Sequence, residues 1–159
     1  MARDEPGERG SVLILMPAAV LVLVVLAAIT IDAAVVFLGE REVADAAASA
    51  ANDAVAAGFD EASFYRDSQL CLSQARVSET AEASVAARTD NAVLTQVTAQ
   101  REISEAGRPQ VTVEVEATVD LILAPALPGA STTRRVSATS TAVLEQDPAG
   151  PEIEVTESC

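Results

Sequence analysis

The side chains that could carry chemistry in this sequence are carboxylates and two cysteines. Histidine, the commonest general base and metal ligand, is absent, and Cys71 and Cys159 lie too far apart to form a CxxC unit. Carboxylates at short spacing can act in acid–base catalysis or bind a cation, and they occur here as Glu79 with Glu82, Glu102 with Glu105 and Glu114 with Glu116. None of them belongs to a DxDxDG calcium loop, and GxSxG, HExxH and glycine-rich phosphate motifs are absent. We therefore predict a non-enzymatic protein whose acids form a solvated surface, with no catalytic residue, metal or other cofactor.

The two cysteines could also form a disulfide if this part of the chain lies outside the cytoplasm. A bond between Cys71 and Cys159 would tie the C-terminal segment to the middle of the chain and contribute about 4 kcal/mol in the chain-entropy model. Two free thiols, or an intermolecular bridge through Cys159, are the alternatives that the sequence leaves open.

The element that must position these groups is an apolar run from Val12 to Ile31, which contains no charged residue. As a helix with a rise of about 1.5 Å per residue, this run would span about 30 Å, the thickness of the hydrocarbon core of a bilayer. A helix also satisfies its backbone hydrogen bonds internally, as a membrane requires. The alternatives are a buried helix of a soluble core, which is usually shorter, and a cleaved secretory signal, whose apolar core runs about 7 to 15 residues. The length favours a single transmembrane anchor.

Charge indicates on which side of the membrane the rest of the chain lies. Arg3 and Arg9 precede the anchor, whereas Arg41 is the first basic residue after it. The positive-inside rule therefore places the N-terminus in the cytoplasm and the body outside the cytoplasmic membrane. The chain has 24 acidic residues, 10 basic residues and a formal net charge of −14. This balance argues against nucleic acid binding, which needs a cationic surface, and is typical of solvation.

Beyond the anchor, the alanine-rich stretch from Asp32 to Gly58 continues the same helix, so we expect one helix over residues 12–58. Small residues recur along it at three- and four-residue steps, among them Ala47, Ala51 and Gly58. Such a face lets other helices approach closely, in the membrane or in a filament. Alternatively, the alanines reflect helix propensity alone.

The sequence makes a specific prediction for each of two residues of this helix. Pro17 removes one backbone hydrogen bond near the start of the anchor and predicts a kink there. Asp32 follows the apolar run directly, where a charge is costly unless it reaches a headgroup or a partner. We expect Asp32 either to lie at headgroup level or to set the register with a neighbouring helix.

The remaining sequence predicts a further helix and then strands. We expect a helix from Val77 to Arg101, whereas Ser63–Ser73 is ambiguous. Alternating apolar and polar residues from Val111 to Leu123 predict a strand with one buried face. Prolines and a glycine in 124–130 predict a turn, and the β-branched residues of 131–145 predict a second strand, which completes a long antiparallel hairpin. The acidic segment 146–159 is expected to be a flexible tail unless Cys159 ties it down.

This layout resembles the TadE and TadG family of pilus assembly proteins, which are minor pseudopilins of the tight-adherence (Flp) type IV pilus system. The similar residues are a charged head ending in ERG at Glu8–Gly10, the apolar helix, Asp32, and the run VVFLGEREVADAAASAA over 35–51. The strand, turn and strand that end in SATSTAVLE also resemble the family's C-terminal β region.

The resemblance implies an α+β, pilin-like fold and a role as a non-enzymatic, membrane-anchored minor pseudopilin or assembly factor. Its implied partners are other pilins or pseudopilins, pilus assembly membrane proteins and the lipid bilayer. The chain would divide into five segments: a cytoplasmic head or short leader (1–11), a transmembrane helix (12–31), its extension (32–58), an extracytoplasmic α+β domain (59–145) and an acidic tail (146–159). The alternative function is a membrane-tethered extracytoplasmic binding or envelope-spacing domain unrelated to pili.

The resemblance further implies cleavage by prepilin peptidase between Gly10 and Ser11. Many processed members carry a glutamate at the position that Leu15 occupies here. Two alternatives therefore stay open, a processed pseudopilin and an uncleaved TadG-like or actinobacterial-type protein. The sequence also leaves open whether the chain enters the filament or assists its assembly.

Overall fold

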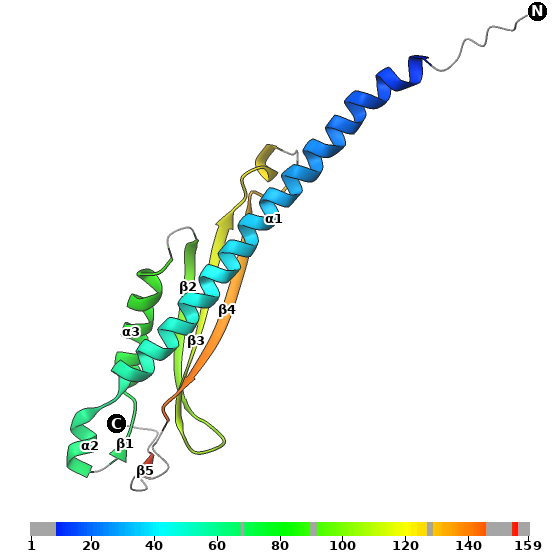
Figure 1. Cartoon of the computed structure of the whole chain (residues 1–159). Helices are drawn as coiled ribbons and strands as arrows, with labels where there is room; N and C mark the ends of the chain where they lie inside the picture. The colour runs from blue at the N-terminus through cyan, green and yellow to red at the C-terminus, as the bar shows by residue number, and fades with distance from the viewer. Residues whose placement is uncertain (1–8, 68, 90–91, 127–128, 146–153, 156–159) are drawn as a thin grey trace, which may run out of the picture.

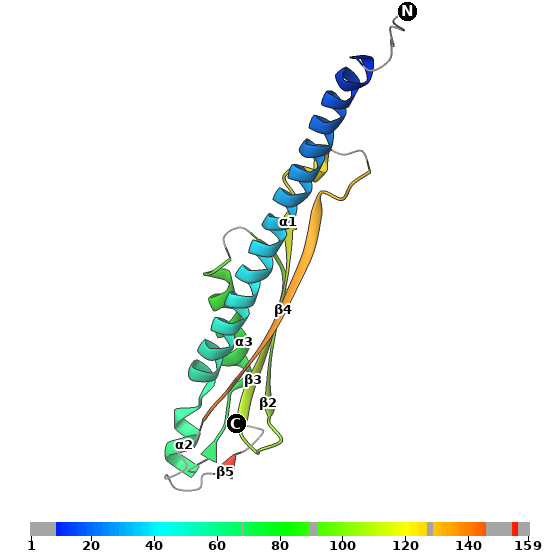
Figure 2. The ribbon, with the colours of Figure 1, turned by 45° about the vertical axis from the view of Figure 1, so that its right-hand side comes forward.

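One long helix organises the molecule (Figure 1). The computed structural model describes residues 9–67, 69–89, 92–126, 129–145 and 154–155. Helix α1 runs from Arg9 to Gly58, contains 50 residues and continues through Pro17 as one element. Its length is about 75 Å at 1.5 Å per residue. The single helix predicted over residues 12–58 is confirmed, and its first part extends away from the rest of the described chain in both views (Figures 1 and 2).

The second part of α1 lies on an antiparallel sheet of three strands in the order β2–β3–β4. The strands are β2 (Val93–Ile103), β3 (Pro109–Asp120) and β4 (Thr133–Val143). Central strand β3 buries alternate side chains from Val111 to Val119, as its sequence period predicts. The chain passes from β3 to β4 through the short 3₁₀ helix η1 (Ala124–Ala126) and Gly129, whose φ is +80°. The predicted α+β class and the β3–β4 hairpin are confirmed.

The predicted helix over Val77–Arg101 is wrong in its second half. Helix α3 spans Gln74–Ala86, and the chain then enters strand β2 at Val93. The sequence VLTQVTAQREI of this strand is rich in β-branched residues, which favour a pleated, half-buried surface. Pairing along β3, with Ala99 opposite Val113, supplies hydrogen bonds and burial that local propensity does not reveal.

A small distal region joins α1 to α3. It contains helix α2 (Glu61–Asp67) and strand β1 (Gln69–Leu70), which pairs in parallel with β5 (Glu154–Val155). Cys71 follows β1 directly, is 2% exposed and is disulfide-bonded. Cys159 lies outside the described residues, as do residues 146–153 of the predicted flexible tail. The pairing of Cys71 with Cys159 and the behaviour of that tail therefore stay predictions.

The core between α1, α3 and the sheet consists mainly of alanine and valine. A Cβ atom added at Gly58 would lie 2.5 Å from Cγ2 of Val77 on α3, and one added at Gly39 would collide with Val119 on β3. These close approaches explain why α1 carries small residues. The buried α1 residues are Val43, Ala46, Ala47, Ala50, Ala51, Ala54 and Val55.

The burial of α1 changes two of the expectations. Ala47, Ala51 and Gly58 are buried within their own domain, so they do not offer a face to helices of other subunits. The segment 32–58 is likewise more than an extension of the anchor, because its later residues form one side of the domain core. The folded domain thus includes the second part of α1 as well as residues after Gly58.

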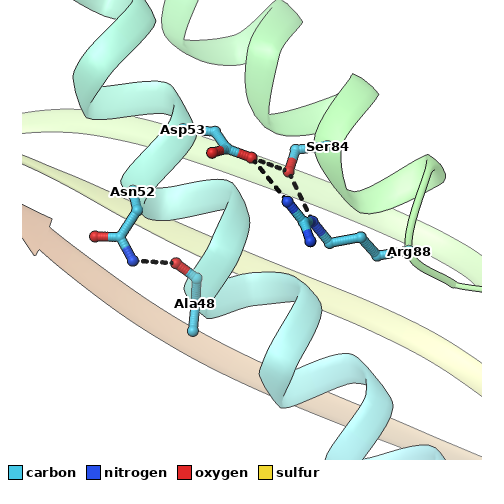
Figure 3. Close-up of polar contacts among 5 residues, drawn as sticks. All are labelled: Ala48, Asn52, Asp53, Ser84 and Arg88. Carbon is cyan, nitrogen blue, oxygen red and sulfur yellow. Dashed lines mark hydrogen bonds and ion pairs between the residues drawn. The ribbon is translucent and has the colours of Figure 1, made fainter.

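Polar contacts fix α3 against its neighbours. Asp53 on α1 accepts hydrogen bonds from the Ser84 hydroxyl at 2.6 Å and from Nη2 of Arg88 at 3.4 Å (Figure 3). The Arg88–Asp53 ion pair is about half exposed, so it adds little to stability by itself, but these contacts set the register of the two helices.

At its other end, α3 covers part of the free edge of β2. The side-chain amide of Gln74 donates to the carbonyl oxygen of Ala99 at 2.8 Å and accepts from the backbone N–H of Arg101 at 3.1 Å. Gln74 thereby satisfies the backbone groups that a further strand would otherwise bind.

Candidate membrane anchor and membrane-proximal site

The first part of α1 presents a continuous apolar surface. Its large side chains range from 41% exposed at Val25 to 73% exposed at Met16. Contiguous apolar exposure of this extent marks a membrane or protein interface. Within the part of the chain that the structure describes, α1 is the one helix whose length and composition suit a membrane span. The coordinates are therefore compatible with a single-pass anchor, the element that the sequence predicted. The exposed set is Leu15, Met16, Val20, Leu21, Val22, Leu23, Val24, Val25, Leu26, Ile29 and Ile31.

Asp32 is the first charged residue after this run, and its carboxylate is bound within the chain. Oδ1 accepts the backbone N–H groups of Ile122 and Leu123, both at 2.9 Å, and Oδ2 accepts that of Ala124 at 2.7 Å. Consecutive backbone N–H groups form a concave site for an anion, and hydrogen bonds to an ionised carboxylate are among the stronger ones in proteins. Asp32 therefore fastens the β3–β4 connection to α1.

This arrangement corrects one of the two expectations for Asp32. The sequence suggested a headgroup-level residue or a contact with a neighbouring helix. The structure commits both carboxylate oxygens to the chain's own backbone, which replaces the contact with a neighbouring helix, whereas the position at headgroup level stays a prediction. The residue still lies at the end of the apolar run, and its partners come from a loop 90 residues further along the chain. Sequence reasoning missed Ile122–Ala124 because hydrogen bonds from backbone N–H groups leave no residue-type signal.

A shallow groove lies beside this contact. Its lining includes Asp32 and Phe37 from α1, Leu121 after β3, and Arg134 at the start of β4. Phe37 and Leu38 are 63% and 62% exposed, so apolar surface continues past Asp32. The groove is lined by two carboxylates, that of Glu40 and that of Asp32, which is bound to backbone N–H groups, and its one basic side chain, Arg134, suits contact with an anion or with solvent.

The chain gives no match to models of protein families, to functionally described proteins or to solved structures. The TadE/TadG resemblance therefore rests on the sequence features given above.

The three carboxylate pairs, which the sequence predicts to be solvated, lie apart from this groove. Glu79 and Glu82 are exposed on α3, Glu102 and Glu105 are exposed near the β2–β3 turn, and Glu114 and Glu116 alternate with buried residues on β3. Among the described residues, no group of His, Cys, Asp and Glu side chains is placed to hold a metal ion. Gly10 and Ser11 fall at the start of α1, and the structure does not test cleavage between them.

Among the described residues, Asp60 is the carboxylate whose pKa clearly departs from its ordinary value, and its contacts stabilise the fold. The Ser63 hydroxyl donates to Oδ2 of Asp60 at 2.6 Å, and this hydrogen bond lowers the pKa of the carboxyl below its ordinary value of 3.8. Backbone N–H groups of Ala62 and Ser63 and the charge of Arg76 act in the same direction. Because Asp60 precedes α2, the pKa shift reflects capping of that helix.

Proposed function

We propose that this chain is a non-enzymatic, membrane-anchored minor pseudopilin or assembly factor of a Flp/Tad-type pilus or related secretion system. Its N-terminus would lie in the cytoplasm and its domain outside the cytoplasmic membrane. The observation that carries the proposal is the double use of α1, which is an exposed apolar rod before Asp32 and one side of a domain core after it. This architecture supports a role in which the domain is held at a set height above the bilayer.

The distribution of buried residues indicates which surfaces such a subunit would use. Ala47 and Ala51 are buried in the domain core, so contacts with other pilus proteins must involve different residues. The exposed apolar face between Leu15 and Ile31 is available for helices in the membrane, where packing depends on van der Waals contact and small residues. Asp32 and the β3–β4 connection would transmit such contacts to the domain, because they join it to the emerging anchor.

Deletion of the gene in its native host is expected to reduce pilus assembly while pilin synthesis continues. Re-expression of the full chain should restore assembly, and crosslinking in the membrane should recover pilin or pseudopilin subunits with it. A matched control carries the same domain behind a cleavable secretory signal in place of residues 12–31, and it should fail to restore assembly. Unchanged pilus assembly and pilin export after deletion would contradict the proposal and leave the tethered binding or envelope-spacing domain as the explanation.

The intact mass of the chain from native membranes should reveal the oxidised cysteine pair. We expect the mass to rise by two hydrogen atoms on reduction, because Cys71 is buried and disulfide-bonded and the chain has two cysteines. An unchanged mass would contradict a Cys71–Cys159 bond. The same spectrum gives the N-terminus: a start at Ser11 assigns a processed pseudopilin, and a start at Met1 or Ala2 assigns an uncleaved TadG-like protein. A start beyond Ala28 would contradict the membrane anchor.

A further inference from the structure

We propose that the β3–β4 connection is a second membrane contact of this protein. The segment, here called the proximal loop, comprises the described residues 121–126 and 129–130. It would enter the boundary between headgroups and acyl chains in the leaflet from which α1 emerges, with Arg134 and Arg135 directed toward lipid phosphates. The inference rests on the proposed function in one respect, namely that α1 spans the bilayer.

The position of the proximal loop follows from its attachment to α1. Asp32 is the first charged residue after the apolar run, so it marks the level at which the helix leaves the hydrocarbon core. Three backbone hydrogen bonds hold Ile122, Leu123 and Ala124 at that same level. Figures 1 and 2 agree in placing η1 beside α1, at the end of the sheet nearest the free part of the helix. The loop therefore reaches the bilayer surface whenever α1 spans the membrane.

The composition of the proximal loop suits that location. The sequence stretch 121–130, LILAPALPGA, contains no charged residue, whereas loops in water are usually polar. Ile122 is 64% exposed, and Pro125 and Ala126 are also exposed. Together with Phe37 on α1, which lines the same groove as Leu121, these residues add apolar surface beside the anchor. Burial of this surface in the interfacial region of a bilayer would remove it from water.

Two of the charges beside the proximal loop suit an anionic lipid surface. Arg134 and Arg135 are the second and third residues of β4, and both are exposed, while the exposed Asp120 directly before the loop carries the opposite charge. Within the described residues neither forms an ion pair, and Arg134 lines the groove next to Asp32. Glu40, the other acid of this groove, lies two helical turns further from the membrane, about 12 Å along α1. Arginine binds phosphate through parallel N–H groups, so these two residues suit lipid headgroups.

The depth of the loop can be measured in the full chain, because the natural sequence contains no tryptophan. The variant Ile122→Trp is reconstituted in phosphatidylcholine and phosphatidylglycerol vesicles whose acyl chains are brominated near the headgroup or near the bilayer centre. We expect blue-shifted emission and stronger quenching by the shallow bromines. Glu105→Trp, at the opposite end of the sheet, is the water-exposed control, and Val22→Trp, in the middle of the apolar run, is the control for the anchor.

The controls distinguish failure of the proximal-loop contact from failure of the transmembrane anchor. If lipid bromines quench Val22→Trp but leave Ile122→Trp unquenched and open to aqueous iodide, the proximal-loop contact is overturned while the anchor stands. If neither variant is quenched, α1 does not span the bilayer, and both the inference and the basis of the proposed function fail. If Ile122→Trp is protected from iodide but is not quenched by lipid, protein rather than lipid covers the loop, which also overturns the lipid assignment.

The role of the arginines is tested in the same Ile122→Trp background. Raising the phosphatidylglycerol fraction should increase shallow quenching in the parent, and the combined Arg134→Gln and Arg135→Gln variant should lose this dependence. We expect each arginine to raise the ratio of molecules with the loop inserted in the bilayer to molecules with the loop in water about fivefold. Arg66→Gln, an exposed arginine on α2, is the matched control and should behave as the parent. An equal lipid dependence in the double variant would overturn the assignment of these arginines to phosphates.

Discussion

Replacement of Asp32 by alanine is expected to release the β3–β4 connection from α1. Three backbone N–H groups lose a charged acceptor, and a hydrogen bond to a charged group contributes about 1.5 to 3 kcal/mol. Water replaces part of this loss, because the contact is partly exposed. We expect hydrogen exchange of the Ile122, Leu123 and Ala124 amides in the full chain, in lipid nanodiscs, to accelerate about 10- to 100-fold, where tenfold corresponds to about 1.4 kcal/mol.

Two variants serve as controls for this prediction. Asp32→Asn keeps one side-chain oxygen as an acceptor and should give an intermediate exchange rate. Asp45→Ala removes a carboxylate whose partner, Arg41, lies 3.7 Å away in an exposed pair, so the loop amides should exchange as in the parent. Parent-like exchange of the three loop amides in Asp32→Ala would show that the carboxylate does not hold the loop.

Replacement of Ala47 by leucine is expected to destabilise the domain by about 2 to 3 kcal/mol, because an overfilled core must shift side chains and backbone. Ala47 is fully buried, and the facing core residues on the sheet and α3 are themselves fully buried valines such as Val113, Val115 and Val77. The measurement is thermal or denaturant unfolding of the full chain in detergent micelles, followed by the loss of β-sheet circular dichroism.

Ala48→Leu is the matched control, because Ala48 neighbours Ala47 in sequence but is exposed. Alanine and leucine are both strong helix formers, so the two variants differ mainly in packing. We expect Ala48→Leu to change the free energy of unfolding by less than about 0.5 kcal/mol. Equal stability of the two leucine variants would contradict the placement of Ala47 in the core.

The parts of the fold that the sequence predicts are those with a strong local period. The apolar run and the alanine-rich stretch up to Gly58 predict α1, and the strict alternation from Val111 to Val119 predicts β3. Strand β2 escapes prediction because its exposure pattern alternates poorly. As an edge strand it gains order from pairing with β3, and that pairing is not visible in a window of local sequence.

In the candidate site, too, the local sequence identifies the important residues but not their partners, which lie far along the chain. Asp32 stands out in the sequence because a charge follows an apolar run, but its binding partners are backbone N–H groups 90 residues away. The small residues Ala47 and Ala51 are correctly associated with close packing, yet the sequence does not say what they pack against. The structure shows that the answer is the domain's own sheet and α3.

The contact of Gln74 with β2 has a consequence for self-association. The sheet has two edges, and the amide of Gln74 occupies backbone groups at Ala99 and Arg101 on one of them. Within the described residues, β4 pairs only with β3, so the other edge keeps free backbone groups. Gln74 therefore makes one part of the β2 edge a poor template for another strand, whereas β4 of one copy could pair with β4 of a second copy and close a two-fold pair. A single side-chain amide thus disfavours open-ended strand stacking through the stretch of β2 that it covers, even where many copies are present at high local concentration.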